Sequence, residues 1–191
     1  MNIKSLTDEQ IIYKLQEIRK SDVEAFKFYF DEVFNRYKNQ IFNLCRYHGL
    51  QNDDAFDVIQ ETFIKLIKFL PSFEKESAFK PWFFKIVLNL VRGKYNEIKK
   101  HRFIHIEEID STNQIFEEKD FEKLQNKEYI ISILNRIPKK FRDVILLNIY
   151  GELELTEIAK ILGISLRQVY NRLEKGYQML KEIFGEDGVE L

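Results

Sequence analysis

The sequence contains few of the residues on which tight turns depend. Its 191 residues include only 7 glycines and 3 prolines, which is about half of the share that an average chain carries. Sandwiches and barrels of antiparallel strands need many such turns. The scarcity therefore argues against an all-β fold and favours helices joined by a few short connections.

Cysteine and long apolar runs are equally scarce. The single cysteine, Cys45, excludes an internal disulfide framework and is typical of a reducing compartment. No uninterrupted apolar run approaches the roughly 18 residues of a membrane span, and the first ten residues lack the apolar core of a secretory signal. We therefore expect a cytoplasmic protein without a membrane span.

An excess of charge of one sign is also missing. The chain has 30 basic and 31 acidic residues and a formal net charge of −1, whereas a uniformly basic nucleic-acid binder has a high isoelectric point. Any contact with DNA must therefore come from local basic segments. Hydrophobic residues make up 45% of the chain, among them 17 phenylalanines and 9 tyrosines, so a packed core is expected.

Apolar periodicity predicts an all-α fold with two small helical domains. Apolar residues recur three and four positions apart through residues 1–103 and again through residues 127–187. Residues 104–126 differ from both, because between Glu107 and Glu122 seven acids accompany one base, a net charge of −6. We interpret 104–126 as an acidic linker that is flexible or weakly ordered.

Residues 155–169 carry the ordered features of a helix-turn-helix. A small residue, Ala159, suits two helices that approach closely, Gly163 can adopt a left-handed turn, Ile164 can fill the corner, and Ser165 can cap the next helix. The following helix has an apolar stripe that includes Leu166, Val169, Leu173 and Tyr177. The alternative is an ordinary helical hairpin.

The polar side of that last helix has the side chains that read DNA bases. Arginine pairs with guanine edges and asparagine or glutamine with adenine edges in the major groove, where helix-turn-helix proteins place this helix. The candidate residues are Arg167, Gln168, Asn171, Arg172 and Lys175. A second basic group, which either contacts phosphates or is a solvated surface, comprises Arg136, Lys139, Lys140 and Arg142.

A basic helix face follows Pro81. Lys85, Asn89, Arg92 and Lys99 are spaced so that they fall within about 80° of one another around a helix. Residues 85–102 contain six bases and one acid, a net charge of +5, and such a field can bind phosphates. The alternative is a solvated helix surface.

A smaller polar face precedes it in the chain. Asp57, Gln60 and Glu61 stand at positions i, i+3 and i+4, opposite an apolar stripe that includes Phe56, Ile59 and Phe63. The face is either exposed polar surface or a docking site for a basic partner helix.

Signals for catalysis and metal binding are weak. Cys45 with His48, and His101 with His105, have the spacing of metal ligands but lack a second pair of ligands. There is no glycine-rich phosphate loop or nucleophile elbow. We therefore expect no metal site, no cofactor and no enzymatic activity.

Two motif sets resemble those of bacterial RNA polymerase sigma factors. Residues 57–63 (DVIQETF) and 79–89 (FKPWFFKIVLN) resemble conserved region two, most closely that of the small ECF (extracytoplasmic function) group. Residues 134–138 (LNRIP) and 141–144 (FRDV), followed by the helix-turn-helix, resemble region four. The resemblance implies transcription initiation as the function and core RNA polymerase, promoter DNA and an anti-sigma factor as partners.

The resemblance also implies a role for each polar face. It assigns Asp57, Gln60 and Glu61 to the clamp helices of the polymerase β′ subunit, and region four to the β flap. The residues implied at the −10 element, where a base is flipped and the opened strand is held, are Lys80, Lys85, Asn89, Arg92 and Lys99. The residues implied at the −35 element are Arg167, Gln168, Asn171, Arg172 and Lys175. Tyr170 departs from the polar residue usual in the family and leaves the −35 preference open.

Geometry is compatible with two promoter elements. Elements nearly two helical turns apart lie roughly 60 Å from one another, and a linker of this length extends to roughly 70 Å. Two alternatives stay open: an adaptor or decoy that binds polymerase without initiating, and a stand-alone helix-turn-helix regulator that binds duplex DNA without polymerase.

Overall fold

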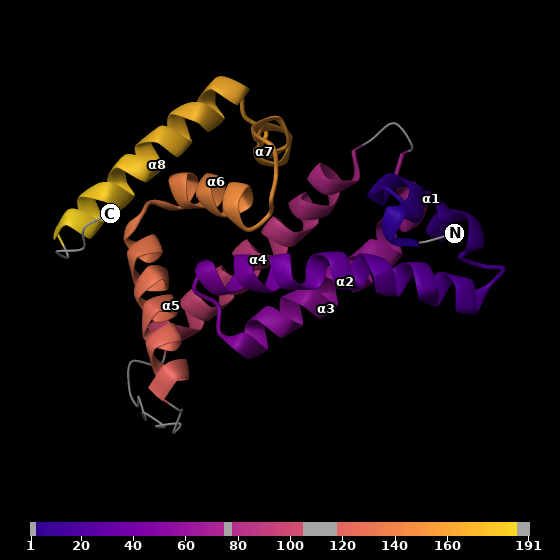
Figure 1. Ribbon diagram of the computed structural model, residues 1–191, viewed down its shortest axis with the longest axis horizontal. Coiled ribbons are helices and arrows are strands. Elements are labelled where there is room, and N and C mark those ends of the chain that lie inside the picture. Colours follow the sequence, from indigo (N-terminus) through magenta and orange to yellow (C-terminus); the bar gives the residue numbers. More distant parts are fainter. Residues whose placement is uncertain (1–2, 75–77, 105–117, 187–191) are drawn as a thin grey trace.

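The computed structural model describes residues 3–74, 78–104 and 118–186, and within these ranges the chain is helical with no strand (Figure 1). The predicted all-α fold is therefore confirmed. An N-terminal module contains the helices α1 (Asp8–Ile18), α2 (Val23–Tyr47), α3 (Asn52–Phe69) and α4 (Phe79–Ile104), with short 3-10 turns at Ile3–Ser5 and Leu70–Ser72. A C-terminal module contains α5 (Glu118–Arg136), α6 (Lys139–Ile149), α7 (Leu155–Leu162) and α8 (Leu166–Glu186).

Local sequence signals explain most helix ends. The Asp22 carboxylate accepts a hydrogen bond from the backbone N–H of Ala25 at 2.9 Å and so caps α2. Gly163, between α7 and α8, adopts the left-handed conformation with φ of +64° that the helix-turn-helix pattern predicts. Helix α3 begins without a side-chain cap. Gln51 holds the cap position without a side-chain hydrogen bond, and Asp53 and Asp54 lie in the first turn, where their negative charges interact favourably with the positive end of the helix dipole.

An aromatic core holds the N-terminal module together. Tyr37 of α2 contacts Phe79, Phe83 and Phe84 of α4 with ring centroids 5.1 to 5.9 Å apart, and Phe63 of α3 lies 5.8 Å from Phe83. All five rings are buried. This burial offsets much of the conformational entropy lost on folding. The stripe predicted on α3 needs one correction: Phe56 is 53% exposed, because α3 turns Ala55, Val58 and Thr62 inward instead.

The C-terminal module packs around α6, whose residues 141–147 are all buried. Helix α8 approaches α6 closely at Gly176, where a Cβ atom would lie 2.7 Å from the Ile145 Cδ1 atom. Val169 and Leu173 of α8 are buried as predicted, whereas Leu166 and Tyr177 are 38% and 44% exposed. The apolar stripe on α8 is thus narrower than predicted. At this turn of the helix Gly176, and not the side chain of Tyr177, contacts α6.

Helix α5 begins inside the segment interpreted as an acidic linker. Residues 118–126 are helical, and residues 105–117 lie outside the described residues. Residues 118–126 also have high helix propensity, which their acidic charge does not reveal. Glu, Lys, Leu and Gln are all good helix formers, and no glycine or proline interrupts them.

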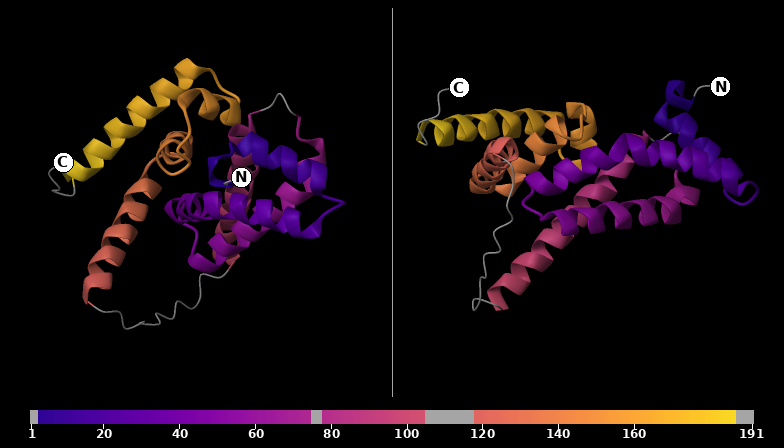
Figure 2. Two further views of the ribbon diagram at one scale, coloured as in Figure 1. Left: turned by 45° about the vertical axis from the view of Figure 1, so that its right-hand side comes forward. Right: turned by 60° about the horizontal axis from the view of Figure 1, so that its bottom comes forward.

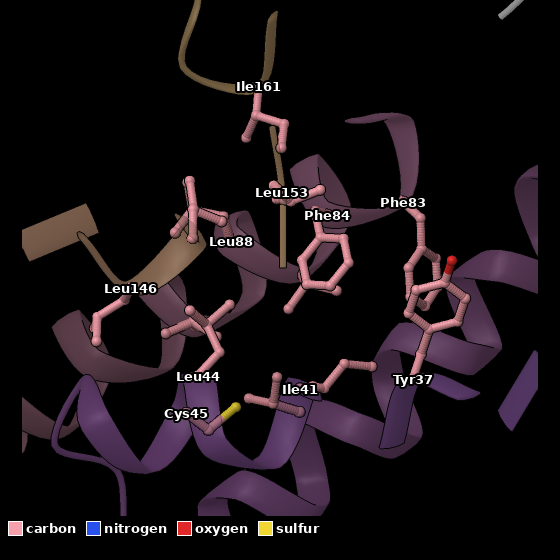
Figure 3. Close-up of a cluster of buried hydrophobic side chains, with 14 of the residues drawn as sticks. Tyr37, Ile41, Leu44, Cys45, Phe83, Phe84, Leu88, Leu146, Leu153 and Ile161 are labelled. Atoms are coloured by element: carbon pink, nitrogen blue, oxygen red, sulfur yellow. The ribbon is translucent and has the colours of Figure 1, made fainter. Parts of the chain in front are cut away.

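The two modules pack against each other, which no sequence signal predicts. Helix α4 contacts α7, and α2 contacts both α5 and α6. Figure 2 shows the C-terminal module lying along one side of the N-terminal module in both of its views. The buried side chains form one continuous cluster. Figure 3 shows the part of it in which Leu44 and Cys45 of α2 and Phe84 and Leu88 of α4 lie with Leu146, Leu153 and Ile161 of the C-terminal module.

We expect Gly176→Leu to lower the free energy of unfolding by about 1 to 3 kcal/mol, because the larger side chain overpacks the contact with Ile145. The matched change is Gly93→Ala on α4, where a Cβ meets nothing within 4 Å. It should raise the free energy of unfolding by about 1 kcal/mol through helix propensity alone. Urea unfolding followed by circular dichroism measures both, and equal effects of the two variants would contradict the packing described at Gly176.

Candidate functional site

The predicted polar face of α3 is exposed and borders a groove. The side chains of Asp57 and Glu61 are 65% and 48% exposed, and Gln60 is also exposed. The three residues line one wall of a groove of about 460 Å³ between α3 and α4. Ile64 adds an apolar patch to the same wall. Such a groove suits a partner helix that presents both basic and apolar side chains.

One base of α4 belongs to this face rather than to the basic face. The Lys94 Nζ atom lies 3.1 Å from Asp57 Oδ2 and 3.4 Å from Asp54 Oδ1. The hydrogen bond that the Lys94 ammonium donates to the Asp57 carboxylate raises the pKa of Lys94. Lys94 therefore orients Asp57 at the edge of the groove, and it contributes less to the positive field of α4 than a count of its bases indicates.

The basic face of α4 is mostly open to solvent. Lys85, Asn89 and Lys99 are exposed, and Lys80 is half-buried in the first turn of the helix. Arg92 differs from the others, because its Nη2 atom donates a hydrogen bond across the module boundary to Asp143 Oδ2 of α6 at 2.5 Å. The structure therefore places four of the predicted residues at the surface of α4 and ties the fifth to the C-terminal module.

The polar side of α8 faces outward. Arg167, Gln168, Asn171 and Lys175 are exposed and Arg172 is half-buried. Gln168 has a structural task in addition, since its Oε1 atom accepts the Ser165 N–H at 3.0 Å while its own N–H donates to Ser165 Oγ at 3.3 Å. This reciprocal cap fixes the start of α8. It leaves the Gln168 amide NH₂ group available as a donor.

Sequence reasoning missed two residues of α1 that position the start of α4. The Gln16 Nε2 atom donates to the carbonyl oxygens of Leu70 and Phe73, both at 2.8 Å. Glu9 accepts the backbone N–H of Phe79, the first residue of α4, at 3.2 Å. These contacts join residues more than 50 positions apart, so no local pattern could have revealed them.

A buried polar cluster lies between the modules. His48 at the end of α2 and Asp143 of α6 are 3% and 2% exposed, with His48 Nε2 3.6 Å from Asp143 Oδ1. Burial, aided by the positive charges of Arg142, Lys139 and Arg92, lowers the pKa of His48 to about 3. The imidazole is therefore neutral at pH 7, and its contact with Asp143 is not an ion pair.

Arg142 is part of this cluster, which corrects the expectation that it belongs to an exposed basic group. It is only 4% exposed, and its Nη1 atom donates to Asn135 Oδ1 and to the Leu134 carbonyl. Its guanidinium also lies 5.7 Å from the centre of the Tyr95 ring of α4. It cannot contact a phosphate from this position.

The part of the chain that the structure describes holds neither a cluster of metal ligands nor a helix that could span a membrane. Those residues contain no group of three or more histidine, cysteine, aspartate or glutamate side chains that could hold a metal ion. Cys45 is buried, as expected for a core thiol, and the side chains of His101 and His105 lie outside the described residues. No described helix is both long enough and apolar enough to cross a membrane.

Both modules match known families of protein domains. Residues 33–102 match the family model for Sigma-70 region 2, and residues 127–180 match that for Sigma-70 region 4. The chain is 27% identical over 180 residues to the ECF RNA polymerase sigma factor SigW of Bacillus subtilis, which covers 88% of this chain and 94% of SigW. It is 23% identical to the ECF RNA polymerase sigma-E factor of Haemophilus influenzae, covering 93% and 95% of the two chains.

Solved structures share the fold. CnrH, in a complex with the cytosolic domain of CnrY, matches with a TM-score of 0.72 at 21% identity, over 94% of this chain and 98% of CnrH. The sigma factor RpoE of Bartonella quintana, in a complex with the anti-sigma factor NepR, matches with a TM-score of 0.59 at 20% identity, over 82% and 96% of the two chains.

The two matched regions, in this order, define a transcription initiation factor of the sigma-70 type. Within that class the chain belongs to the ECF group of RNA polymerase sigma factors, as the resemblance of its motifs predicted.

We expect the folded protein to lose stability as the pH falls below about 6.5, because His48 is held neutral. In the unfolded chain the imidazole binds a proton near its ordinary pKa of 6.5, whereas the folded protein accepts none until about pH 3. The free energy of unfolding should therefore fall by up to about 1.4 kcal/mol per pH unit in this window. Urea unfolding between about pH 7 and pH 5.5 measures the slope, before most carboxylates titrate. His48→Gln should flatten it, and an equal slope in both proteins would count against this assignment.

Proposed function

We propose that each of the three polar faces binds a different partner during promoter recognition in the cytoplasm. The face of α3 binds the core polymerase, the face of α4 binds the −10 element and the face of α8 binds the −35 element. The observation that carries this proposal is that the three faces are exposed on three separate helices, while the apolar sides of the same helices form the core.

The α3 face suits the clamp helices of the β′ subunit. Asp57, Gln60 and Glu61 offer two carboxylates and an amide along one wall of an open groove. A basic helix that binds there replaces Lys94 as the partner of Asp57. The exchange costs little, because the exposed ion pair between Lys94 and Asp57 is weak.

The α4 face suits the opened strand of the −10 element. Lys80, Lys85 and Lys99 supply positive charge for phosphates and Asn89 supplies a donor and an acceptor for a base edge. Arg92 adds a guanidinium that can bind a phosphate through two hydrogen bonds once it leaves Asp143.

The α8 face suits the major groove of the −35 element. Arg167, Gln168 and Asn171 lie in the first two turns, the part of the helix that meets base edges in helix-turn-helix proteins. Arg172 and Lys175 extend the face toward the next turn. We further propose that region four binds the polymerase β flap and that an anti-sigma factor regulates the chain, because the structurally similar sigma factor RpoE forms a complex with the anti-sigma factor NepR.

Run-off transcription with core polymerase tests the proposed function. A library of promoter sequences should yield defined transcripts only when the chain is present. Binding to core polymerase without such transcripts would favour the adaptor or decoy instead, and duplex DNA binding that needs no polymerase would favour the stand-alone regulator.

We expect Gln60→Ala combined with Glu61→Ala to weaken binding to core polymerase by tenfold or more, about 1.4 kcal/mol, and to leave folding unchanged because both side chains are exposed. Titration of labelled protein with core polymerase measures the affinity, and circular dichroism monitors folding. The matched control is Lys27→Ala combined with Asp31→Ala, two exposed residues of α2 outside the groove. Equal affinities of the two double variants would remove the α3 face from the proposal.

We expect Arg172→Ala to cost about 1 to 3 kcal/mol at one base position of the −35 element and to relax the preference there. Transcription from a library randomised over that element measures the profile. Lys181→Ala, an exposed change further along α8, should leave the profile as it is. An unchanged profile for Arg172→Ala would show that this side chain reads no base.

A further inference from the structure

We propose that Arg92 and Asp143 form a latch that keeps the two modules closed and withholds Arg92 from DNA, so that promoter binding requires the pair to separate. The inference rests on the proposed role of Arg92 at the −10 element. It adds a regulatory state in which the protein occupies its own DNA-binding residue.

The latch joins the modules at the edge of their apolar contact. Arg92 belongs to α4 of the N-terminal module and Asp143 to α6 of the C-terminal module. The guanidinium is about one third exposed, whereas the carboxylate is 3% exposed. A charge-assisted hydrogen bond in such a site is stronger than one at the surface, because little water competes for the carboxylate.

Charge balance makes Asp143 indispensable to the closed arrangement. Around this single carboxylate lie three cationic groups, namely Arg92, Arg142 and Lys139, together with the neutral imidazole of His48. Burial and the two neighbouring guanidinium groups lower the pKa of Lys139, while Asp143 opposes that shift. Without the carboxylate, cations from both modules would face one another in a poorly solvated space, and repulsion would favour separation.

Aromatic and apolar side chains of both modules pack at the boundary that the latch spans. The rings of Tyr47 at the end of α2 and Tyr150 at the end of α6 stack across the boundary, with centroids 4.2 Å apart and planes 12° from parallel. Leu88 of α4 and Ile161 of α7 lie in the same buried cluster (Figure 3).

The closed arrangement is incompatible with simultaneous contact to both promoter elements. The elements lie roughly 60 Å apart on DNA, yet α4, which carries the −10 face, packs directly on α7, the first helix of the helix-turn-helix. The modules must therefore separate on a promoter. Separation breaks the bond from Arg92 to the Asp143 carboxylate, and a DNA phosphate can then take the place of that carboxylate.

The single cysteine provides the test, because Cys45 is fully buried in the continuous cluster to which both modules contribute, and its burial raises the thiol pKa to about 12. We expect Asp143→Asn, which removes the charge at constant shape, to be alkylated by iodoacetamide on the order of tenfold faster than the wild-type chain. Small-angle X-ray scattering should show a larger radius of gyration. The matched control is Asp31→Asn, an exposed acid of α2, which should react at the wild-type rate.

Two results would overturn the latch. One is an Asp143→Asn protein with wild-type helix content, alkylation rate and radius of gyration. If Asp143→Asn loses its helix content, Arg92→Gln breaks the same pair from the more exposed side. The second overturning result is an Arg92→Gln protein with the wild-type alkylation rate and radius of gyration. Neither assay contains polymerase or DNA, so failure of the latch is distinguishable from failure of the proposed function, which run-off transcription tests.

Discussion

The burial of α4 on two sides at once is the interaction on which the rest of the structure depends. At about 100° per residue, the buried apolar side chains of α4 span an arc of about 180°, wider than the stripe of a helix that covers a single core. In order around the helix they are Phe79, Phe83, Val87, Val91, Phe84 and Leu88. One edge of this arc packs against Tyr37 of α2. The other lies with Leu153 and Ile161 of the C-terminal module.

The width of that arc sets where the functional faces of α4 are placed. On the same helical wheel the basic face begins about 20° beyond the apolar edge formed by Leu88, with Lys99 and Arg92 nearest to it. Arg92 therefore lies close enough to the module boundary to reach Asp143, whereas Asn89 lies on the far side and borders the groove of α3. The surface proposed for DNA is thus flanked by the polymerase groove on one side and by the C-terminal module on the other.

Polar contacts give this apolar arrangement its specificity. Apolar packing is non-directional, and it alone does not define which way the C-terminal module docks. The hydrogen bond from Arg92 to Asp143, the guanidinium of Arg142 over Tyr95 and the stacked rings of Tyr47 and Tyr150 each require one orientation. Asp143 faces Arg92 and Lys139 from within this boundary, so the proposed latch adds one charged contact to the apolar packing that joins the modules.

The sequence by itself determined the all-α fold, the helix-turn-helix at Gly163 and the exposed faces of α3, α4 and α8, because each follows from local periodicity, capping or turn chemistry within a few residues. Only the tertiary structure decided that Arg142 is buried, that Arg92 bonds to Asp143 and that Gln16 holds the turn before α4. These features join residues far apart in the chain. Whether a charged side chain is solvated or buried depends on what packs over it, and that information is absent from the spacing of residues along one helix.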